Sequence, residues 1–149
     1  MNSILLKEAF GIETILYSKV EYVKYLLFKK NEIWSYLNGD MKRGENPIIS
    51  TIRIIREDIN FLEYESIEYA NKFHCINIEE SVRKQYRDNP KQYFRFCLSV
   101  EIKKQTPKLN NKFEDYNWFD YVTAKKLIKN ETSKQFLDIV NKNITELGM

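Results

Sequence analysis

The pattern of apolar and polar positions predicts a chain in which strands and helices follow one another. Residues 93–102 alternate strictly, with Phe94, Phe96 and Leu98 on one side, which predicts a strand with one apolar face. Shorter runs rich in Ile, Leu, Tyr and Val predict further strands. These strands are expected within residues 13–28, with turns near 18 and at 29–31, and over residues 33–37, 62–71 and 116–119.

The start of the first helix is the clearest boundary. Pro47 suits a first turn because its missing N–H has no partner to lose there, and Asn46 can cap the helix. Isoleucines at positions 48, 52, 55 and 59 recur at helical spacing and predict a buried stripe that ends near Asn60. Further helices are expected at 78–87, at 124–128 with Thr123 as cap, and at 130–146.

The order of these elements predicts an α+β fold or a mixed α/β sandwich. The absence of repeats, linkers and low-complexity tracts favours a single domain over residues 1–149. A content of 43% hydrophobic residues excludes global disorder, and a net charge of +3 excludes a dedicated nucleic-acid coat. We find no secretory signal and no apolar run of membrane-spanning length, so no membrane partner is expected. The two cysteines form no disulfide framework, which favours a cytoplasmic location, and the single His excludes a three-His zinc centre.

The end of the first predicted helix carries acidic residues that suggest chemistry. Positions 54, 57 and 58 share one helix face, expected to turn away from the apolar stripe, and Glu57 and Asp58 occupy two of them. Carboxylates are poorly placed at a helix C-terminus, where the dipole favours cations. This mismatch indicates a partner cation or a nearby Arg.

The segment from Gly39 to Phe61 resembles the Nudix box, G-x5-E-x7-R-E-U-x-E-E-x-G-U, where U is aliphatic. The residues that match the pattern are Gly39, Glu45, Arg53, Ile55, Glu57, Asp58 and Phe61. The flanking segments agree, so the resemblance extends over about residues 15–144. The tail is most similar to the diadenosine tetraphosphate hydrolase branch.

The resemblance implies a Nudix-type α/β/α sandwich with a mixed sheet between the box helix and a C-terminal helix. It also implies that Mg²⁺ is held by the Gly39 carbonyl, Glu57 and Asp58, with the two acids as the catalytic residues. Glu45 and Arg53 are expected to be structural, with Arg53 holding the Gly39–Glu45 loop. The residues expected to contact substrate are Lys29, Lys42 and Tyr93.

The sequence also departs from the family pattern. Ile54 stands where the family has the Glu most directly tied to metal binding, and it can neither bind a hard cation nor accept a proton. Asp58 is one methylene shorter than the usual Glu, and Asn60 replaces a Gly. Lys112 and Phe113 stand where a downstream loop usually carries Glu and His.

Three functions remain open on this basis. The leading one is a degenerate Nudix protein that binds a nucleotide or dinucleoside polyphosphate, with weak or lost hydrolysis and a weakened Mg²⁺ site. The second is an active pyrophosphohydrolase that takes its missing carboxylate from Glu101, Glu114 or Asp115. The third is a binding module for RNA, a ribonucleoprotein or a protein. The basic residues that suggest the RNA partner are Arg83, Lys84, Arg87 and Arg95.

Overall fold

The sheet is the centre of the molecule. The computed structural model describes residues 6–61, 63–103 and 106–147. Within these residues seven strands form one mixed sheet. The strands are β1 (Phe10–Ser18), β2 (Lys24–Lys30), β3 (Ile33–Ser35), β4 (Leu37–Asp40), β5 (Ser66–Asn77), β6 (Gln92–Glu101) and β7 (Asp115–Phe119). Their order is β3-β2-β1-β6-β5, with β4 also paired to β1 and β7 to β2. The β1–β6 pair is parallel, whereas the other pairs are antiparallel.

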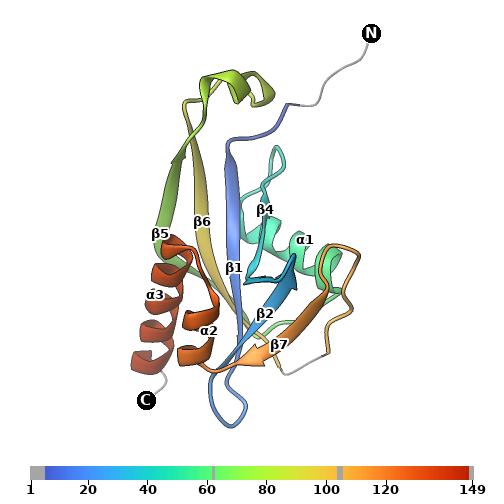
Figure 1. Cartoon of the computed structure of the whole chain (residues 1–149), viewed down its shortest axis with the longest axis vertical. Helices are drawn as coiled ribbons and strands as arrows, with labels where there is room; N and C mark the ends of the chain where they lie inside the picture. Colours follow the sequence, from blue (N-terminus) through green and yellow to red (C-terminus); the bar gives the residue numbers. More distant parts are fainter. Residues whose placement is uncertain (1–5, 62, 104–105, 148–149) are drawn as a thin grey trace.

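Helices cover both faces of this sheet (Figure 1). The helix α1 (Pro47–Ile59) packs on one face, and α2 (Tyr121–Leu127) and α3 (Glu131–Leu147) pack on the other. Alternation along β1 sends Ile12 and Leu16 into the core beneath α1, and Ile15 and Tyr17 into the core beneath α3. The predicted sandwich, with a mixed sheet between the first helix and the C-terminal helix, is therefore confirmed.

The boundaries of α1 follow from its capping residues. The Asn46 side chain accepts a hydrogen bond from the Ile49 N–H (2.8 Å), and Pro47 occupies the first turn. Asn60 ends the helix in the left-handed region with φ 58°, a conformation that Asn tolerates better than most residues. The predicted start and end of this helix are confirmed.

One predicted strand is in fact two strands. Residues 33–37 were expected to form a single run, but Tyr36 separates β3 from β4. Gly39, expected in a loop, lies inside β4 opposite Ile12 of β1. The backbone pairing with β1 extends the regular structure beyond the apolar residues that could be recognised in the sequence.

Other boundaries are set by partners rather than by local pattern. The strand expected at 62–71 is β5, which runs to Asn77 because it pairs with β6 along that length; Leu62 lies outside the described residues. The helix expected at 78–87 is a short 3₁₀ helix, η1 (Glu80–Gln85), without a side-chain cap. The cap of α2 is Asp120 instead of Thr123, whose N–H donates to the Asp120 carboxylate (2.8 Å).

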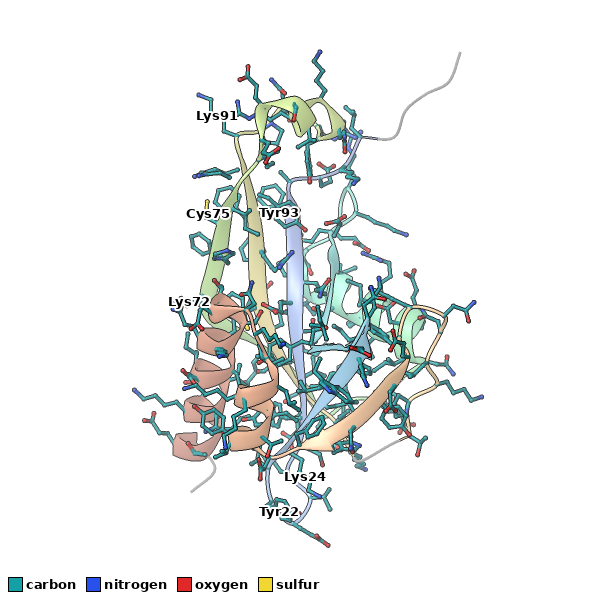
Figure 2. All side chains as sticks on the ribbon, in the orientation of Figure 1. Tyr22, Lys24, Lys72, Cys75, Lys91 and Tyr93 are labelled. Atoms are coloured by element: carbon teal, nitrogen blue, oxygen red, sulfur yellow. The ribbon has the colours of Figure 1, made fainter. Side chains whose placement is uncertain are left out.

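The strands β1, β5 and β6 extend past the helices, and η1 closes their far end (Figure 1). Lys91 lies at this end, whereas Tyr22 and Lys24 lie at the opposite end (Figure 2). A small apolar cluster of Ala9, Ile78 and Tyr93 forms the local core there. Among the helices of the described residues, none has the length and apolar character needed to cross a membrane.

Candidate functional site

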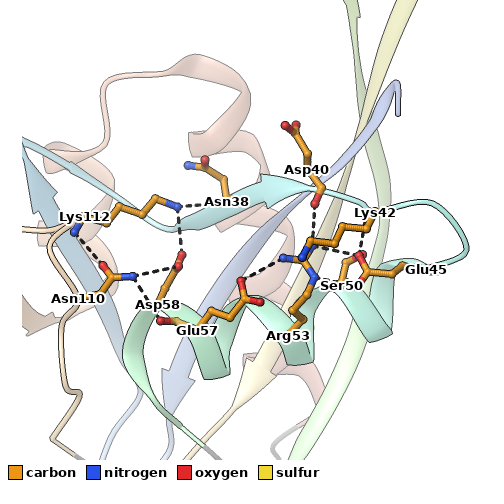
Figure 3. Close-up of polar contacts among 10 residues, drawn as sticks. All are labelled: Asn38, Asp40, Lys42, Glu45, Ser50, Arg53, Glu57, Asp58, Asn110 and Lys112. Atoms are coloured by element: carbon orange, nitrogen blue, oxygen red, sulfur yellow. Dashed lines mark hydrogen bonds and ion pairs between the residues drawn. The ribbon is translucent and has the colours of Figure 1, made fainter. Parts of the chain in front are cut away.

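The loop between β4 and α1 is fixed by Arg53. Its guanidinium donates to both carboxylate oxygens of Glu45 (2.8 and 3.0 Å) and to the Asp40 carbonyl (2.8 Å), as Figure 3 shows. Glu45 also accepts from the Ser50 hydroxyl and the Lys42 N–H (2.8 and 2.7 Å). The hydrogen bonds from Arg53, with those from Lys42 and Ser50, lower the pKa of Glu45 to about 2, and Glu45 in turn raises the pKa of Arg53. Arg53 and Glu45 therefore contact each other and the loop, which is consistent with the predicted role of holding it.

Gly39 and Ile54 are packed against each other. A Cβ added to Gly39 would lie 2.6 Å from the Cδ1 atom of Ile54, so a larger residue on β4 would collide with α1. Ile54 is 4% exposed and belongs to the core beneath α1. The expectation that position 54 turns away from the apolar core is therefore wrong. Because β4 packs closely against α1, the Ile54 side chain lies in the core. Positions 57 and 58 lie on the same side of the helix, one turn further along.

Asp58 is engaged by a lysine. The Lys112 ammonium lies 3.1 Å from the Asp58 carboxylate and also donates to the Asn38 carbonyl of β4 (3.3 Å) (Figure 3). Met41 N donates to Phe10 O (2.8 Å), so these two residues form a hydrogen-bonded pair of the β1–β4 ladder. In an antiparallel ladder such pairs recur at every second residue. The Gly39 carbonyl therefore points toward β1, and the Asn38 carbonyl points away from it. The carbonyl that contacts the Lys112 ammonium belongs to Asn38, whereas the resemblance implied a Mg²⁺ contact at the Gly39 carbonyl.

Glu57 stands at the edge of this region. Its side chain is 53% exposed and forms an i,i+4 ion pair with Arg53 (3.3 Å). Glu57 and Asp58 thus lie together at the end of α1. The sequence predicted a partner cation or a nearby Arg for them, and the structure places Arg53 beside Glu57 and Lys112 beside Asp58.

The residues present do not fit a divalent metal ion. Among the described residues, no group of three or more His, Cys, Asp or Glu side chains is close enough to hold one. Mg²⁺ requires several oxygen ligands, whereas here position 54 offers none and an ammonium occupies the space beside Asp58.

The three alternative carboxylates are used elsewhere. Glu114 accepts a hydrogen bond from the Asn31 N–H (2.7 Å) and closes the β2–β3 turn. The Asp115 side chain accepts from the next N–H, of Tyr116 (2.8 Å), and Glu101 lies 3.8 Å from Lys19.

The predicted substrate residues lie on three different segments of the chain. Lys29 lies on β2 with its ammonium 6.0 Å from the Trp34 ring centre, and Lys42 lies in the loop before α1. Tyr93 covers Gly11 and donates to the Asp40 carboxylate (2.6 Å) on the protruding part of the sheet (Figure 2). Tyr93 lines a pocket with Asp40, whereas Lys42 lines a different pocket with Glu45.

The basic segment near η1 is largely used in internal contacts. Arg83 donates to the Ile78 carbonyl (3.0 Å), and Arg87 forms an ion pair with Glu8 (3.1 Å). Arg95 lies 5.9 Å from the Tyr93 ring centre, and Lys84 lies on η1. These contacts give the arginines structural roles.

Sequence reasoning missed a pocket on the α3 face of the sheet. It has a volume of about 370 Å³ and lies between β1, β3 and the start of α3. The lining residues that carry polar or aromatic groups are Glu13, Trp34, Ser35, Tyr36, Lys129, Asn130 and Ser133. A volume of this size suits a small-molecule site, which usually combines apolar walls with a few polar groups.

The carboxyl group of Glu13 is the notable feature of this pocket. It is 5% exposed and accepts a hydrogen bond from the Ser133 hydroxyl (2.6 Å). Burial raises its pKa, although Ser133 and the charge of Arg95 act in the opposite direction. The signal in the sequence was an acid inside a strand of mostly apolar residues.

Comparisons with solved structures identify the architecture. A Nudix hydrolase structure from Listeria monocytogenes superposes with a TM-score of 0.79, at 14% identity, covering 92% of this chain and 94% of that one. The Nudix domain of NrtR from Shewanella oneidensis, complexed with ADP-ribose, gives 0.70 at 13% identity, with 94% and 90% covered. The chain has the Nudix fold. An Ap4A hydrolase from C. elegans shares this Nudix fold with a TM-score of 0.66 at 14% identity, covering 91% of this chain and 98% of that one.

No family model matches the sequence, and no curated protein matches it either. The Nudix fold is therefore supported by structure, and at these identities it defines the architecture alone. In this Nudix fold α1 is the helix that carries the residues matched to the box. Ile54 and Lys112 are two of the positions at which the sequence departs from the pattern that it resembles.

Proposed function

We propose that this chain is a degenerate Nudix-fold protein that binds a nucleotide or nucleotide-like ligand and has weak or no pyrophosphohydrolase activity. The observation that carries the proposal is the burial of Ile54 against Gly39. A hydrocarbon side chain there supplies neither a ligand for a hard cation nor a proton acceptor. Loss of such a group removes several kcal/mol of barrier lowering, at about 1.4 kcal/mol for each tenfold change in rate.

The pocket beneath α3 supports the binding part of the proposal. Trp34, which is partly exposed, offers a flat apolar surface, and the Glu13 carboxyl can accept the N–H groups of a base. Lys129 supplies a positive charge at the same pocket. The neighbours with this fold include an Ap4A hydrolase and a domain seen with ADP-ribose, which favours the nucleotide class.

We also propose that residues 1–149 form a single domain. Cys75 and Cys97 are both free thiols, and Cys97 is buried, which suits a reducing compartment such as the cytoplasm.

Calorimetric titration with ATP, Ap4A and ADP-ribose, with and without Mg²⁺, tests the proposal. We expect at least one of these probes to bind without Mg²⁺, and Glu13→Gln to weaken that binding while Glu146→Gln, at the end of α3, leaves it unchanged. Product formation with Mg²⁺ or Mn²⁺ should stay far below ordinary enzyme rates of about 1–10³ s⁻¹.

Turnover at such rates would contradict the claim of impaired catalysis. If that turnover disappeared in Glu57→Gln, the chain would be an active hydrolase. Failure of all three probes to bind would contradict the nucleotide claim.

A further inference from the structure

The geometry at the end of α1 points to Lys112 as a built-in cation that takes the place of a divalent metal ion. Its ammonium lies between a backbone oxygen of β4 and the last carboxylate of α1, at 3.3 Å from Asn38 O and 3.1 Å from Asp58 Oδ2 (Figure 3). A carbonyl and a carboxylate are also the oxygen types that a hard cation uses. The inference concerns the unliganded protein, so it does not depend on nucleotide binding.

The loop that carries Lys112 is anchored to the C-terminal end of α1. Lys108 N donates to Ile59 O (3.1 Å), and Asn110 N donates to Asp58 O (3.4 Å). The Asn110 side chain donates to the Glu57 carbonyl (3.3 Å) and accepts from the Lys112 N–H (2.8 Å). The loop thus satisfies carbonyls that a helix end leaves without partners and brings the lysine to a fixed position.

Electrostatics favours the ammonium in this position. The C-terminus of a helix carries partial negative charge, and the Asp58 carboxylate adds a full charge there with its side chain only 12% exposed. Lys112 neutralises this combination, and Arg53 does the same for the neighbouring Glu57 (3.3 Å). A divalent ion at the same oxygens would have to displace or approach the ammonium, and like charges at such distances repel strongly.

The lysine changes what the site can bind. An ammonium has three donors and no acceptor, and the two contacts with Asn38 and Asp58 use two of the three donors. Lys112 is 35% exposed on its side chain, so the third donor can reach an anionic group directly. The site therefore offers an N–H donor to an anionic group without a metal.

Mn²⁺ titration of the unliganded protein, followed by the EPR signal of the free ion, tests this inference. Wild type should show no Mn²⁺ binding at this site. Lys112→Glu removes the ammonium and adds a carboxylate oxygen, so Mn²⁺ should bind at least about tenfold more tightly than to wild type. Mn²⁺ should also raise the unfolding temperature of that variant and leave that of wild type unchanged.

Control variants test whether Mn²⁺ affinity depends on the positive charge at position 112 or on the net charge of the protein. Lys142→Gln on α3 removes a positive charge far from the loop and should gain no Mn²⁺ affinity. Lys112→Arg keeps the charge and should also gain none, whereas adding Asp58→Asn to Lys112→Glu should abolish the gain.

Two results would overturn the inference. One is Mn²⁺ binding to wild type as tight as to Lys112→Glu. The other is the absence of any gain in both Lys112→Glu and Lys112→Gln, with circular dichroism showing that these variants are folded. If Lys112→Glu does not fold, the Mn²⁺ affinity of the milder variant Lys112→Gln decides the test.

Discussion

Arg53 and Glu45 form a two-point ion pair across eight residues of sequence, with Nε and a terminal nitrogen of Arg53 at 2.8 and 3.0 Å from the two carboxylate oxygens. This pair joins the middle of α1 to the loop that precedes it. Planar guanidinium–carboxylate contacts of this kind fix orientation as well as charge. The loop that follows β4 is therefore held by side-chain chemistry and not by apolar packing alone.

This ion pair makes stability depend on acid pH. The folded-state pKa of Glu45 is lowered from 4.5 to about 2, so its contribution is fully present above about pH 4.5 and is lost as the pH falls toward 2. We expect the free energy of unfolding of wild type to fall more steeply over this window than that of Glu45→Gln. Urea unfolding at a series of pH values measures both slopes, and equal slopes would contradict the prediction.

The two packed glycines of β1 and β4 should differ in their tolerance of a methyl group. In Gly11→Ala the new Cβ would lie 1.8 Å from the Tyr93 hydroxyl oxygen and 2.9 Å from the Gly39 carbonyl oxygen, and a backbone atom cannot easily move. In Gly39→Ala the collision is with the tip of Ile54. Overpacking costs about 1–3 kcal/mol, and we expect Gly11→Ala at or above the upper end and Gly39→Ala at the lower end.

Thermal unfolding of both variants provides the measurement. Adding Ile54→Val to Gly39→Ala removes the methyl group that the new Cβ meets, so it should recover part of the lost stability. No recovery in the double variant would show that Ile54 is not the contact that limits Gly39.

Restoring an acid at position 54 should not restore hydrolysis. Ile54→Glu would bury a carboxylate in the core beneath α1, and we expect a loss of about 3 kcal/mol or more in the free energy of unfolding. Lys112 would still occupy the space beside Asp58. The measurements are urea unfolding and phosphate release with Mg²⁺, and ordinary turnover by this single variant would contradict the prediction.

The buried carboxyl of Glu13 should cost stability at neutral pH. Because burial raises its folded-state pKa, the stability linked to this group is greatest below the unfolded value of 4.5 and declines as the pH rises through the folded value. Glu13→Gln should therefore raise the free energy of unfolding at pH 7, and the gain should shrink toward pH 4. The Ser133 hydroxyl can still donate to the Gln carbonyl, so the hydrogen bond is retained. A variant less stable than wild type at pH 7 would contradict this assignment.

The sequence predicted features whose causes are local. The start of α1 could be read from Asn46 and Pro47, because capping and the proline ring act within one turn. The alternation of residues 93–102 likewise predicted β6, which extends from Gln92 to Glu101. The far end of β5 was missed because its length depends on pairing with β6 and not on its own residues.

The candidate site depended on contacts that no local pattern encodes. Asp58 and Lys112 are 54 residues apart, and only the docked loop brings them together. Position 54 was expected to turn away from the apolar stripe, yet Ile54 packs against Gly39 of β4. Helical spacing gives the direction of a side chain relative to its own helix, but it does not give the position of β4. Glu13 and Ser133 are 120 residues apart, so the pocket they share could not be predicted from either segment.

The protruding end of the sheet has a consequence for dynamics. Beyond the helices, β5 and β6 are supported by the small cluster of Ala9, Ile78 and Tyr93 and by ring contacts of Phe73 with Phe94 and Phe96. A unit with so little buried area opens more readily than the rest of the molecule. Amide protons near Asn77 and Gln92 should therefore exchange with deuterium before those near Leu98, so that this end of the hairpin opens while the central sheet stays closed.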